Sequence, residues 1–308
     1  MILNTGSRTD IPAFYSNWFY NRLEAGYVLA RNPYNPSQIT RYELRPELID
    51  CIVFCTKNPR PMFERWKELE AYKTFWHVTL TPYGREIEPR LPDKKQIMLS
   101  FRELSKRVGP DCIGWRYDPI FLLGRYTPEF HLKAFKFMAE RFKGYTHQVV
   151  ISFIDLYEKT KRNFPQVQAV PAAQQQELTR ALAAIAKDNG MKLYLCLESP
   201  ALAGDNVDTT GCLSQAVLER ALGCRLNVPK GKPAREGCNC LLGADIGAYN
   251  TCPHCCIYCY ANYDREGVLR NWKRHDPYSA LLIGHKEEGD RVHQAEQKSW
   301  LDTEISLF

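Results

Sequence analysis

The sequence lacks any long apolar stretch and any block of like charges. No apolar segment approaches the roughly 20 residues that cross a bilayer, so we expect no membrane-bound form. Residues 1–4 lack the basic start and apolar core of a signal peptide, which predicts a cytoplasmic protein. Lys and Arg number 41 against 35 Asp and Glu, and the net charge of +6 is spread along the chain. Charge of this size leaves a nucleic-acid partner open but gives it little support.

Cysteine, by contrast, is plentiful. Twelve cysteines in a cytoplasmic chain favour metal or redox chemistry over disulfides. Half of them stand alone, and for these we expect the role of a small apolar core side chain. The isolated cysteines are Cys51, Cys55, Cys112, Cys196, Cys212 and Cys224.

Cys252, Cys256 and Cys259 stand in the spacing C-x3-C-x2-C. Three thiolates on one tight loop can each hold one iron of a 4Fe-4S cluster, which leaves the fourth iron open to a small molecule. The alternative is a structural zinc site, which pairs a C-x2-C with a second pair such as Cys238 and Cys240. Three cysteines in one short loop are too crowded for the tetrahedral coordination of one zinc ion, but each can bind a different iron of a cubic 4Fe-4S cluster. We therefore favour the cluster.

The remaining cysteines leave several interpretations open. Cys255 occupies a position where glycine is expected in this kind of loop, and it is a spectator, an alternative ligand or a site of oxidative damage. Cys238 and Cys240 either hold a second metal, with Cys255 as a further ligand, or are free thiols near the first cluster.

Apolar runs of strand length alternate with amphipathic helices. The expected strands are 2–6, 51–56, 74–80, 112–117, 147–154, 192–198 and 245–249, and the expected helices follow Asp10 and Cys259 and cover 92–109, 128–142, 171–189 and 213–222. Residues 27–31 and 38–44 are typical of a hairpin, and 227–237 of a connection. Repeated βα units predict an α/β fold, a partial or full (β/α) barrel of the TIM type. Residues 1–226 would form the barrel domain and 227–308 a cysteine-rich, cluster-binding segment that completes it.

In such barrels the active site lies at the carboxyl ends of the strands. The polar residues expected there are Ser7, Arg8, Thr9, Asp10, Thr56, Lys57, Asn58, Thr81, Tyr83, Arg85, Arg116, Tyr117, Asp118, Ser152, Asp155 and Glu198. Single members also have ordinary explanations, Asp10 as a helix cap and Lys57 as a solvated charge. The catalytic candidates from this set are Asp10, Lys57, Arg116, Asp118 and Glu198.

With the aromatic Tyr258 just before its last cysteine, the loop resembles the cluster loop of radical S-adenosylmethionine (SAM) enzymes. The resemblance implies that the methionine end of SAM chelates the open iron and that Tyr258 lies against the adenine. It implies reductive cleavage of SAM to a 5′-deoxyadenosyl radical, which abstracts hydrogen from an unidentified substrate, with an electron donor such as flavodoxin or ferredoxin. The candidate SAM-binding residues are Tyr258, Asn58, Ser152 and Glu198.

A narrower resemblance spans nearly the whole chain. It is carried by Thr9-Asp10-Ile11-Pro12, Thr56-Lys57-Asn58-Pro59, Arg116-Tyr117-Asp118-Pro119, and a Cys-x-Cys followed by Asp245-Ile246-Gly247 and the cysteine loop. These motifs resemble the bacterial family catalogued as domain of unknown function eighteen-forty-eight, whose radical-SAM-like cysteines lie near the C-terminus. Ordinary radical SAM proteins place the loop after the first barrel strand, so the order here is as if circularly permuted. Tyr260-Ala261-Asn262 is also similar to the cluster loop of spore photoproduct lyase, while a Gly-Gly-Glu counterpart for the SAM amino group is lacking.

Two other classes of protein remain open. A zinc-stabilised nucleic-acid-binding module would use the mild positive charge and the Arg and aromatic residues of 265–274. An iron–sulfur electron-transfer protein would bind its cluster through four protein ligands and would not respond to SAM. Neither function requires a domain of this length.

Overall fold

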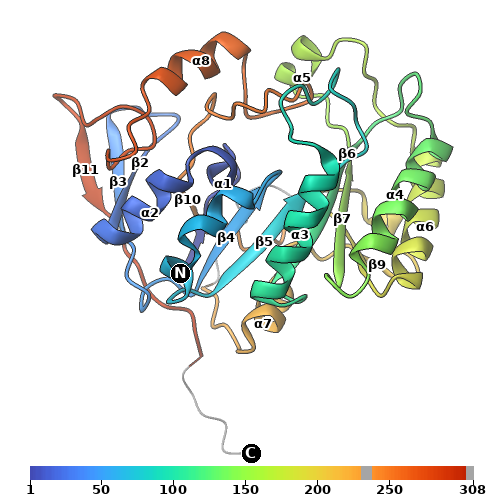
Figure 1. The fold of residues 1–308 in the computed structure, drawn as a ribbon, viewed down its shortest axis with the longest axis horizontal. Coiled ribbons are helices and arrows are strands. Elements are labelled where there is room, and N and C mark those ends of the chain that lie inside the picture. Colours follow the sequence, from blue (N-terminus) through green and yellow to red (C-terminus); the bar gives the residue numbers. More distant parts are fainter. Residues whose placement is uncertain (230–237, 303–308) are drawn as a thin grey trace, which may run out of the picture.

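The computed structural model describes residues 1–229 and 238–302 of the chain (Figure 1). One parallel sheet forms its centre, with the strand order β10-β1-β4-β5-β6-β7-β8-β9. Its strands are β10 (Ala244–Asp245), β1 (Ile2–Asn4), β4 (Cys51–Thr56), β5 (Thr74–Thr79), β6 (Ile113–Ile120), β7 (Gln148–Phe153), β8 (Lys192–Leu195) and β9 (Val207–Asp208). The expected α/β class with a parallel sheet is confirmed.

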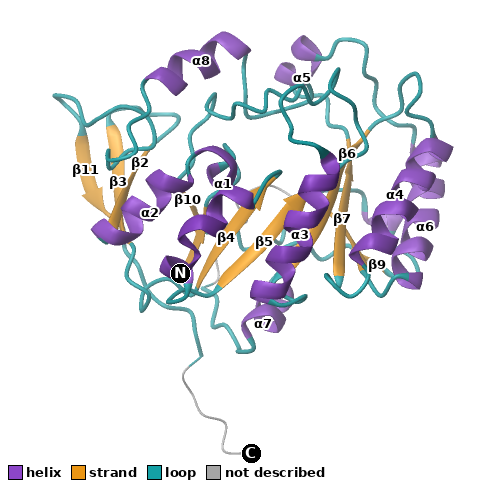
Figure 2. Cartoon of the chain, viewed as in Figure 1, coloured by secondary structure: helices purple, strands orange, loops and turns teal. Residues whose placement is uncertain are grey.

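Helices flank the sheet and follow its strands along the chain (Figure 2). They are α1 (Ile11–Phe14), α2 (Ser16–Ala25), α3 (Lys94–Val108), α4 (Pro128–Phe142), α5 (Glu158–Asn163), α6 (Ala172–Asp188), α7 (Gln215–Leu222) and α8 (Arg265–Lys273), with 3-10 segments η1 (Arg60–Leu69) and η2 (Pro200–Leu202). None of these described helices has both the length and the apolar character needed to cross a membrane.

The helix ends follow the local sequence. Thr127 caps α4 by accepting a hydrogen bond from the Phe130 N–H (3.3 Å), and Pro128 occupies its first turn. Asp10 caps α1 in the same way through the Ala13 N–H (3.0 Å). Gly26 ends α2 with a φ of 75°, a left-handed conformation that suits glycine. Caps of this kind are each worth about 1 kcal/mol, which explains why these boundaries can be predicted from sequence.

The apolar run of β4 is explained by burial on both faces of the sheet. Ile52 and Phe54 pack into the larger core, where Phe54 stacks on Trp76 with 4.0 Å between ring centroids. Cys51 and Val53 alternate with them and pack into a second core on the opposite face, beneath α7. Each such side chain contributes roughly 1.5–3 kcal/mol on burial, so both faces of the sheet must be covered.

A second, three-stranded sheet lies beside the main one. The hairpin of β2 (Tyr27–Arg31) and β3 (Gln38–Glu43) is antiparallel, as expected, and β11 (Arg291–Gln294) adds in parallel to β3. The expected connection at 227–237 falls largely on residues outside the described part of the chain. The later part of the chain thus contributes a strand to each sheet, β10 to the first and β11 to the second.

Candidate functional site

A cavity of about 290 Å³ lies at the carboxyl ends of the parallel strands. Its wall combines the ends of β1, β4 and β7 with the segment between β10 and α8. Of the site residues expected from the sequence, the wall contains Ser7, Thr9, Asp10, Thr56, Lys57, Arg116, Asp118, Ser152, Asp155, Cys238, Cys240, Cys252, Cys255, Cys256, Tyr258 and Cys259. Arg8, Thr81, Tyr83, Arg85 and Tyr117 were also expected but are not among its lining residues in the described chain. Asn58 and Glu198 are not among the lining residues of the described chain, and Asn58 instead accepts a hydrogen bond from the Arg60 N–H (3.3 Å).

Residues 246–262, which we call the cysteine loop, reach this cavity because of how β10 pairs. β10 lies parallel to β1, with Leu3 opposite Ala244 and Asn4 opposite Asp245. The chain therefore leaves β10 at the same edge of the sheet at which it leaves β1 and β4. In Figure 1 the loop is the orange trace that runs between α8 and α5, above the strands.

Hydrogen bonds connect the cysteine loop to the rest of the fold and also link its two ends. The Tyr15 hydroxyl donates to the Thr251 carbonyl (2.5 Å), and the Ile257 N–H donates to the Ile87 carbonyl (3.1 Å). Within the loop, the Asn262 side-chain amide donates to the Cys252 carbonyl (2.8 Å). These contacts hold the first and last parts of the loop together at the cavity.

Cys255 adopts a φ of 52°, the left-handed region that favours glycine. The sequence led us to expect glycine at this position, and the backbone explains why. A non-glycine residue in this conformation costs about 1–2 kcal/mol. The Cys255 thiol lies 3.9 Å from the Cys252 carbonyl and contributes to the cavity wall.

The three spaced cysteines affect one another's ionisation. Burial raises the pKa of Cys252, Cys256 and Cys259, and the charges of Asp10, Cys259 and Cys256 raise that of Cys252 further. The ammonium group of Lys57 acts in the opposite direction on Cys256 and Cys259. In the described part of the chain, no three His, Cys, Asp or Glu side chains converge as ligands of one metal ion.

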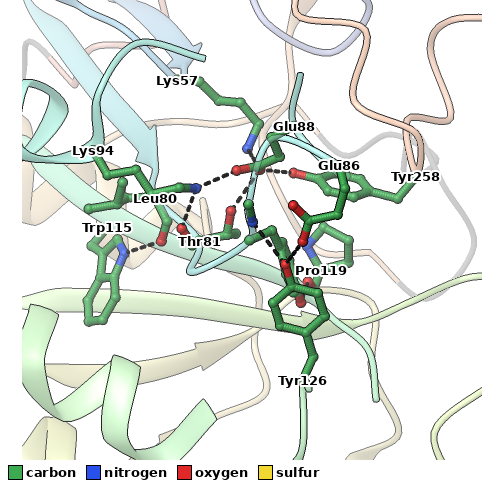
Figure 3. Close-up of polar contacts among 12 residues, drawn as sticks. Lys57, Leu80, Thr81, Glu86, Glu88, Lys94, Trp115, Pro119, Tyr126 and Tyr258 are labelled. Atoms are coloured by element: carbon green, nitrogen blue, oxygen red, sulfur yellow. Dashed lines mark hydrogen bonds and ion pairs between the residues drawn. The ribbon is translucent and has the colours of Figure 1, made fainter. Parts of the chain in front are cut away.

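Glu88 lies at the centre of a buried polar network beside the cysteine loop (Figure 3). Its Oε1 accepts hydrogen bonds from the Lys57 ammonium (2.8 Å), the Thr81 hydroxyl (2.7 Å) and the Tyr258 hydroxyl (2.5 Å). Its Oε2 accepts one from the Lys94 ammonium (2.5 Å). The network joins the ends of β4 and β5 to the cysteine loop.

The charges of this network compensate one another. Burial alone would raise the pKa of Glu88, but the Lys57 and Lys94 ammonium groups outweigh it and lower the pKa to about 2. Burial also works against the charge of Lys57, yet Glu88 and Cys256 raise the pKa of that ammonium above its usual value. Lys57 also lies 5.6 Å from the centre of the Tyr258 ring, a cation–π contact. Lys57 is thus a buried, paired charge and not the solvated one that its sequence allowed.

Asp10 joins three segments of the chain. Besides capping α1, it accepts a hydrogen bond from the Lys57 N–H at Oδ2 (2.8 Å). The same oxygen lies 3.1 Å from His254 Nε2, on the cysteine loop. Its sequence-based role as a cap is confirmed, and the same carboxylate also fixes the cysteine loop against β4.

Arg116 and Asp118 lie two residues apart on β6 and form an ion pair in the cavity wall. Arg116 Nε and Nη2 both donate to the carboxylate, the latter at 2.5 Å, and Asp118 precedes a cis proline. Burial works against the charge of Arg116, but Asp118 raises its pKa well above the usual range. The remaining Nη1 of Arg116 lies 3.4 Å from the Cys212 thiol. Arg116 is thus held in the cavity wall by its ion pair with Asp118.

Glu198 lies just behind the wall, where it accepts a hydrogen bond from the Phe153 N–H (2.7 Å). Partial burial raises its pKa to about 7, with further contributions from Asp155, Cys196 and Asp118. Glu198 is thus a carboxyl group that titrates near neutral pH beside the cavity. Such a group can donate or accept a proton there.

Cys238 and Cys240 lie beside two cysteines that the sequence assigned to the core. Cys240 Sγ is 3.6 Å from Cys212 Sγ, and Cys212 is in turn hydrogen-bonded to Cys196. A hydrogen bond with Cys240 lowers the pKa of Cys238 to about 7. The partners of the Cys-x-Cys pair are therefore Cys196 and Cys212, whereas Cys255 is held on the cysteine loop.

Three buried polar atoms of the wall have no hydrogen-bond partner among the described residues. They are His254 Nδ1, Asn262 Oδ1 and Thr9 Oγ1. An unpaired buried polar group costs about 1–3 kcal/mol, so the hydrogen bonding of this part of the wall is incomplete. All three lie on or next to the cysteine loop or the segment after β1, at one end of the cavity.

A family model described as Domain of unknown function (DUF1848) matches residues 2–261. The chain belongs to this family. The matched region runs from β1 through the whole C-x3-C-x2-C spacing, so it includes the main sheet and most of the cysteine loop. No curated protein and no solved structure matches the chain.

Several residues of the DUF1848 site were not singled out from the sequence. Glu88 lies in the irregular segment between β5 and α3, and Lys94 is the first residue of α3. Nothing local in the sequence shows that Glu88 contacts Lys57, Lys94 and Tyr258. His254 lies between two cysteines of the loop, a position that could have drawn attention to it. Cys196 and Cys212 were assigned to the core because each stands alone in the sequence.

Proposed function

We propose that the protein is a radical SAM-type enzyme that binds a 4Fe-4S cluster through Cys252, Cys256 and Cys259. The observation that carries the proposal is the position of the cysteine loop. The loop follows a strand at the edge of the sheet, next to β1, and its thiols line a cavity with polar residues of β6 and those that follow β1 and β4. Three closely spaced thiols beside a cavity of this size are what a cluster with one open iron requires.

The strand order supports a permuted form of the barrel. We propose that the sheet is a partial (β/α) barrel and that residues 227–308 supply its first strand, β10. Counted from β10, the order continues through β1, β4 and β5 to β9 in sequence order. The loop after the leading strand then carries the cysteines, which is the arrangement of ordinary radical SAM enzymes implied by the resemblance.

The donor set fits a cluster. In a cube each cysteine binds a different iron, so the three thiolates need not converge on one point as the ligands of a single ion do. Burial raises the pKa of these thiols, and the nearby Lys57 charge opposes that effect on Cys256 and Cys259. Lys57 therefore favours the thiolate forms that iron binds.

The chain's own residues would orient SAM at the open iron. The Tyr258 ring faces the cavity while its hydroxyl is held by Glu88, so the ring is fixed in place for the adenine. Ser152, Asn262 and His254 line the same cavity and are the polar residues we assign to the polar groups of SAM. When bound, the cluster supplies the electron that cleaves SAM and starts radical chemistry on the substrate.

The proton-transfer group of this site would be Glu198. Its pKa of about 7 allows it to hold or release a proton at neutral pH, next to the wall residues of β7. Asp118 is bound to Arg116, and Asp10 to Lys57 and His254, so these two carboxylates serve to position the wall.

Electron paramagnetic resonance of anaerobically purified, dithionite-reduced protein tests the proposal. We expect a 4Fe-4S signal that changes shape when SAM is added, together with formation of 5′-deoxyadenosine. A cluster signal that SAM leaves unchanged would indicate an electron-transfer protein. A colourless protein that contains zinc would instead favour a zinc-stabilised nucleic-acid-binding module.

A further inference from the structure

Four cysteines from three separate segments meet in the wall of the cavity, apart from the cysteine loop. They are Cys196 after β8, Cys212 before α7, and Cys238 and Cys240 before β10. Cys196 is hydrogen-bonded to Cys212, the Cys212 and Cys240 sulfurs are 3.6 Å apart, and Cys240 is hydrogen-bonded to Cys238. The sulfurs thus form a chain of neighbouring pairs.

The backbone is shaped for the close approach of the central pair. Gly211 has a φ of 118°, and a Cβ at this position would lie 3.2 Å from Cys240 Sγ. A larger residue would therefore push against the sulfur as well as strain the backbone. Glycine before Cys212 allows the segment to pass directly over Cys240.

N–H groups point at both sulfurs of the central pair. Arg116 Nη1 lies 3.4 Å from Cys212 Sγ, and the guanidinium is held in place by Asp118. The Leu213 N–H donates to Cys240 Sγ at 3.3 Å. Hydrogen bonds of this kind stabilise the negative charge that a sulfur carries when it attacks or leaves in thiol–disulfide exchange. They oppose the burial that contributes to raising the pKa of Cys212 to about 12 and that of Cys240 to about 11.

We propose that Cys212 and Cys240 form a thiol–disulfide exchange site whose substrate is a low-molecular-weight disulfide. Their sulfurs must close from 3.6 Å to about 2.05 Å, a small movement for two side chains on separate segments. Both thiols line the cavity, so a small molecule can reach them, which distinguishes them from the wholly buried Cys51. The site is separate from the proposed cluster and does not depend on it.

The exchange proceeds in two balanced steps. One cysteine thiolate attacks a sulfur of the incoming disulfide, which forms a mixed disulfide and releases one small thiolate. The second cysteine attacks the protein sulfur of that mixed disulfide, which forms the Cys212–Cys240 bond and releases the other small thiolate. Two electrons pass from the protein to the small disulfide, and the two protons of the cysteines end on the released thiols.

Peptide mapping of the full-length protein tests the site directly. Anaerobic protein is equilibrated with glutathione and glutathione disulfide at stepped ratios, quenched with acid, alkylated and digested. We expect a cross-linked peptide pair containing Cys212 and Cys240 to form at least tenfold more than any other pair, with the loss of two alkylatable thiols per chain. Full alkylation of both residues at the highest disulfide ratio would overturn the proposal.

Matched variants identify the residues. Cys212→Ser and Cys240→Ser should each abolish the loss of two thiols, while Cys224→Ser, a half-buried cysteine outside the cavity wall, should not. The wild-type mapping decides the question if a variant fails to fold. Release of one metal ion per chain by a chelator, lost in both variants, would show a metal site instead. Iron is counted in the same samples, so that absence of the Cys212–Cys240 disulfide can be distinguished from absence of the proposed 4Fe-4S cluster.

Discussion

The Tyr258 hydroxyl donates a hydrogen bond to the buried carboxylate of Glu88, 170 residues earlier in the chain. Tyr258 belongs to the cysteine loop, and Glu88 follows β5. This contact connects a loop from the later part of the chain to the centre of the sheet. Because Glu88 is also bound to Lys57 and Lys94, the position of Tyr258 depends on a network of charges centred on a buried carboxylate.

Replacement of Glu88 by glutamine should destabilise the protein strongly. The change leaves the Lys57 and Lys94 ammonium groups without their shared counter-charge, and breaking a buried ion pair costs about 3–5 kcal/mol. Urea unfolding at neutral pH measures the loss. Glu86→Gln is the matched control, because its pair with Arg125 is exposed and should be worth less than about 1 kcal/mol. Equal losses in the two variants would contradict this account of the network.

The contribution of Glu88 should disappear in acid. Its folded-state pKa lies near 2, below the ordinary value of 4.5, so the unfolded chain binds a proton more readily. The stabilisation, about 3 kcal/mol by proton linkage, is therefore complete above pH 4.5 and is lost as the pH falls towards 2. The difference in unfolding free energy between wild type and Glu88→Gln should narrow below pH 4.5. A difference that stays constant down to the lowest measurable pH would contradict the pairing.

Features of the fold and of the site could be predicted from the sequence where they depend on residues close together in the chain. The cap at Asp10 and the apolar run of β4 depend on local sequence, and both were predicted correctly. Glycine was expected at position 255, and the positive φ of Cys255 shows why. These features depend on neighbours a few residues away, which a sequence pattern can represent.

The remaining features depend on contacts between distant segments. β10 has only two residues, and its place beside β1 is set by the pairing of Leu3 with Ala244. Cys212 and Cys240 are 28 residues apart, so their spacing in the sequence does not predict that their sulfur atoms lie close together. Contacts of this kind depend on which strands pair and on where the loops after them lead, and a local sequence pattern does not show either.

Substitutions in the cysteine loop should separate ligands from a spectator. Cys252→Ala, Cys256→Ala and Cys259→Ala should each lose bound iron and SAM cleavage, because a cluster with one open iron has no spare protein ligand. Cys255→Gly should keep both and raise the free energy of unfolding by about 0.5–1 kcal/mol, since it relieves a left-handed φ of 52°. Iron analysis and urea unfolding provide the measurements. Unchanged iron in any of the three alanine variants would remove that residue from the ligand set.

The two parts of the Tyr258 side chain should have different roles. Tyr258→Phe removes the hydrogen bond to Glu88 but keeps the ring, so SAM affinity should change by less than about threefold. Tyr258→Ala removes the ring as well, and loss of a stacking surface worth about 1–3 kcal/mol predicts affinity roughly tenfold weaker or more. SAM titration of reconstituted protein followed by paramagnetic resonance measures both. Equal affinities in Phe and Ala variants, at equal iron content, would exclude the ring from the SAM site.

Glu198 should make the protein less stable as the pH rises towards neutrality. Its pKa is raised from 4.5 to about 7, so between these values the folded chain holds a proton that the unfolded chain has released. The free energy of unfolding therefore falls across this range, by about 1–2 kcal/mol after allowance for partial solvent exposure. Glu198→Gln imitates the protonated carboxyl and keeps an acceptor for the Phe153 N–H, so it should remove this decrease, whereas Glu177→Gln on the exposed face of α6 should not. Urea unfolding at about pH 5 and about pH 8 measures the decrease, and an unaltered pH dependence in Glu198→Gln would show that Glu198 is already ionised in the folded protein.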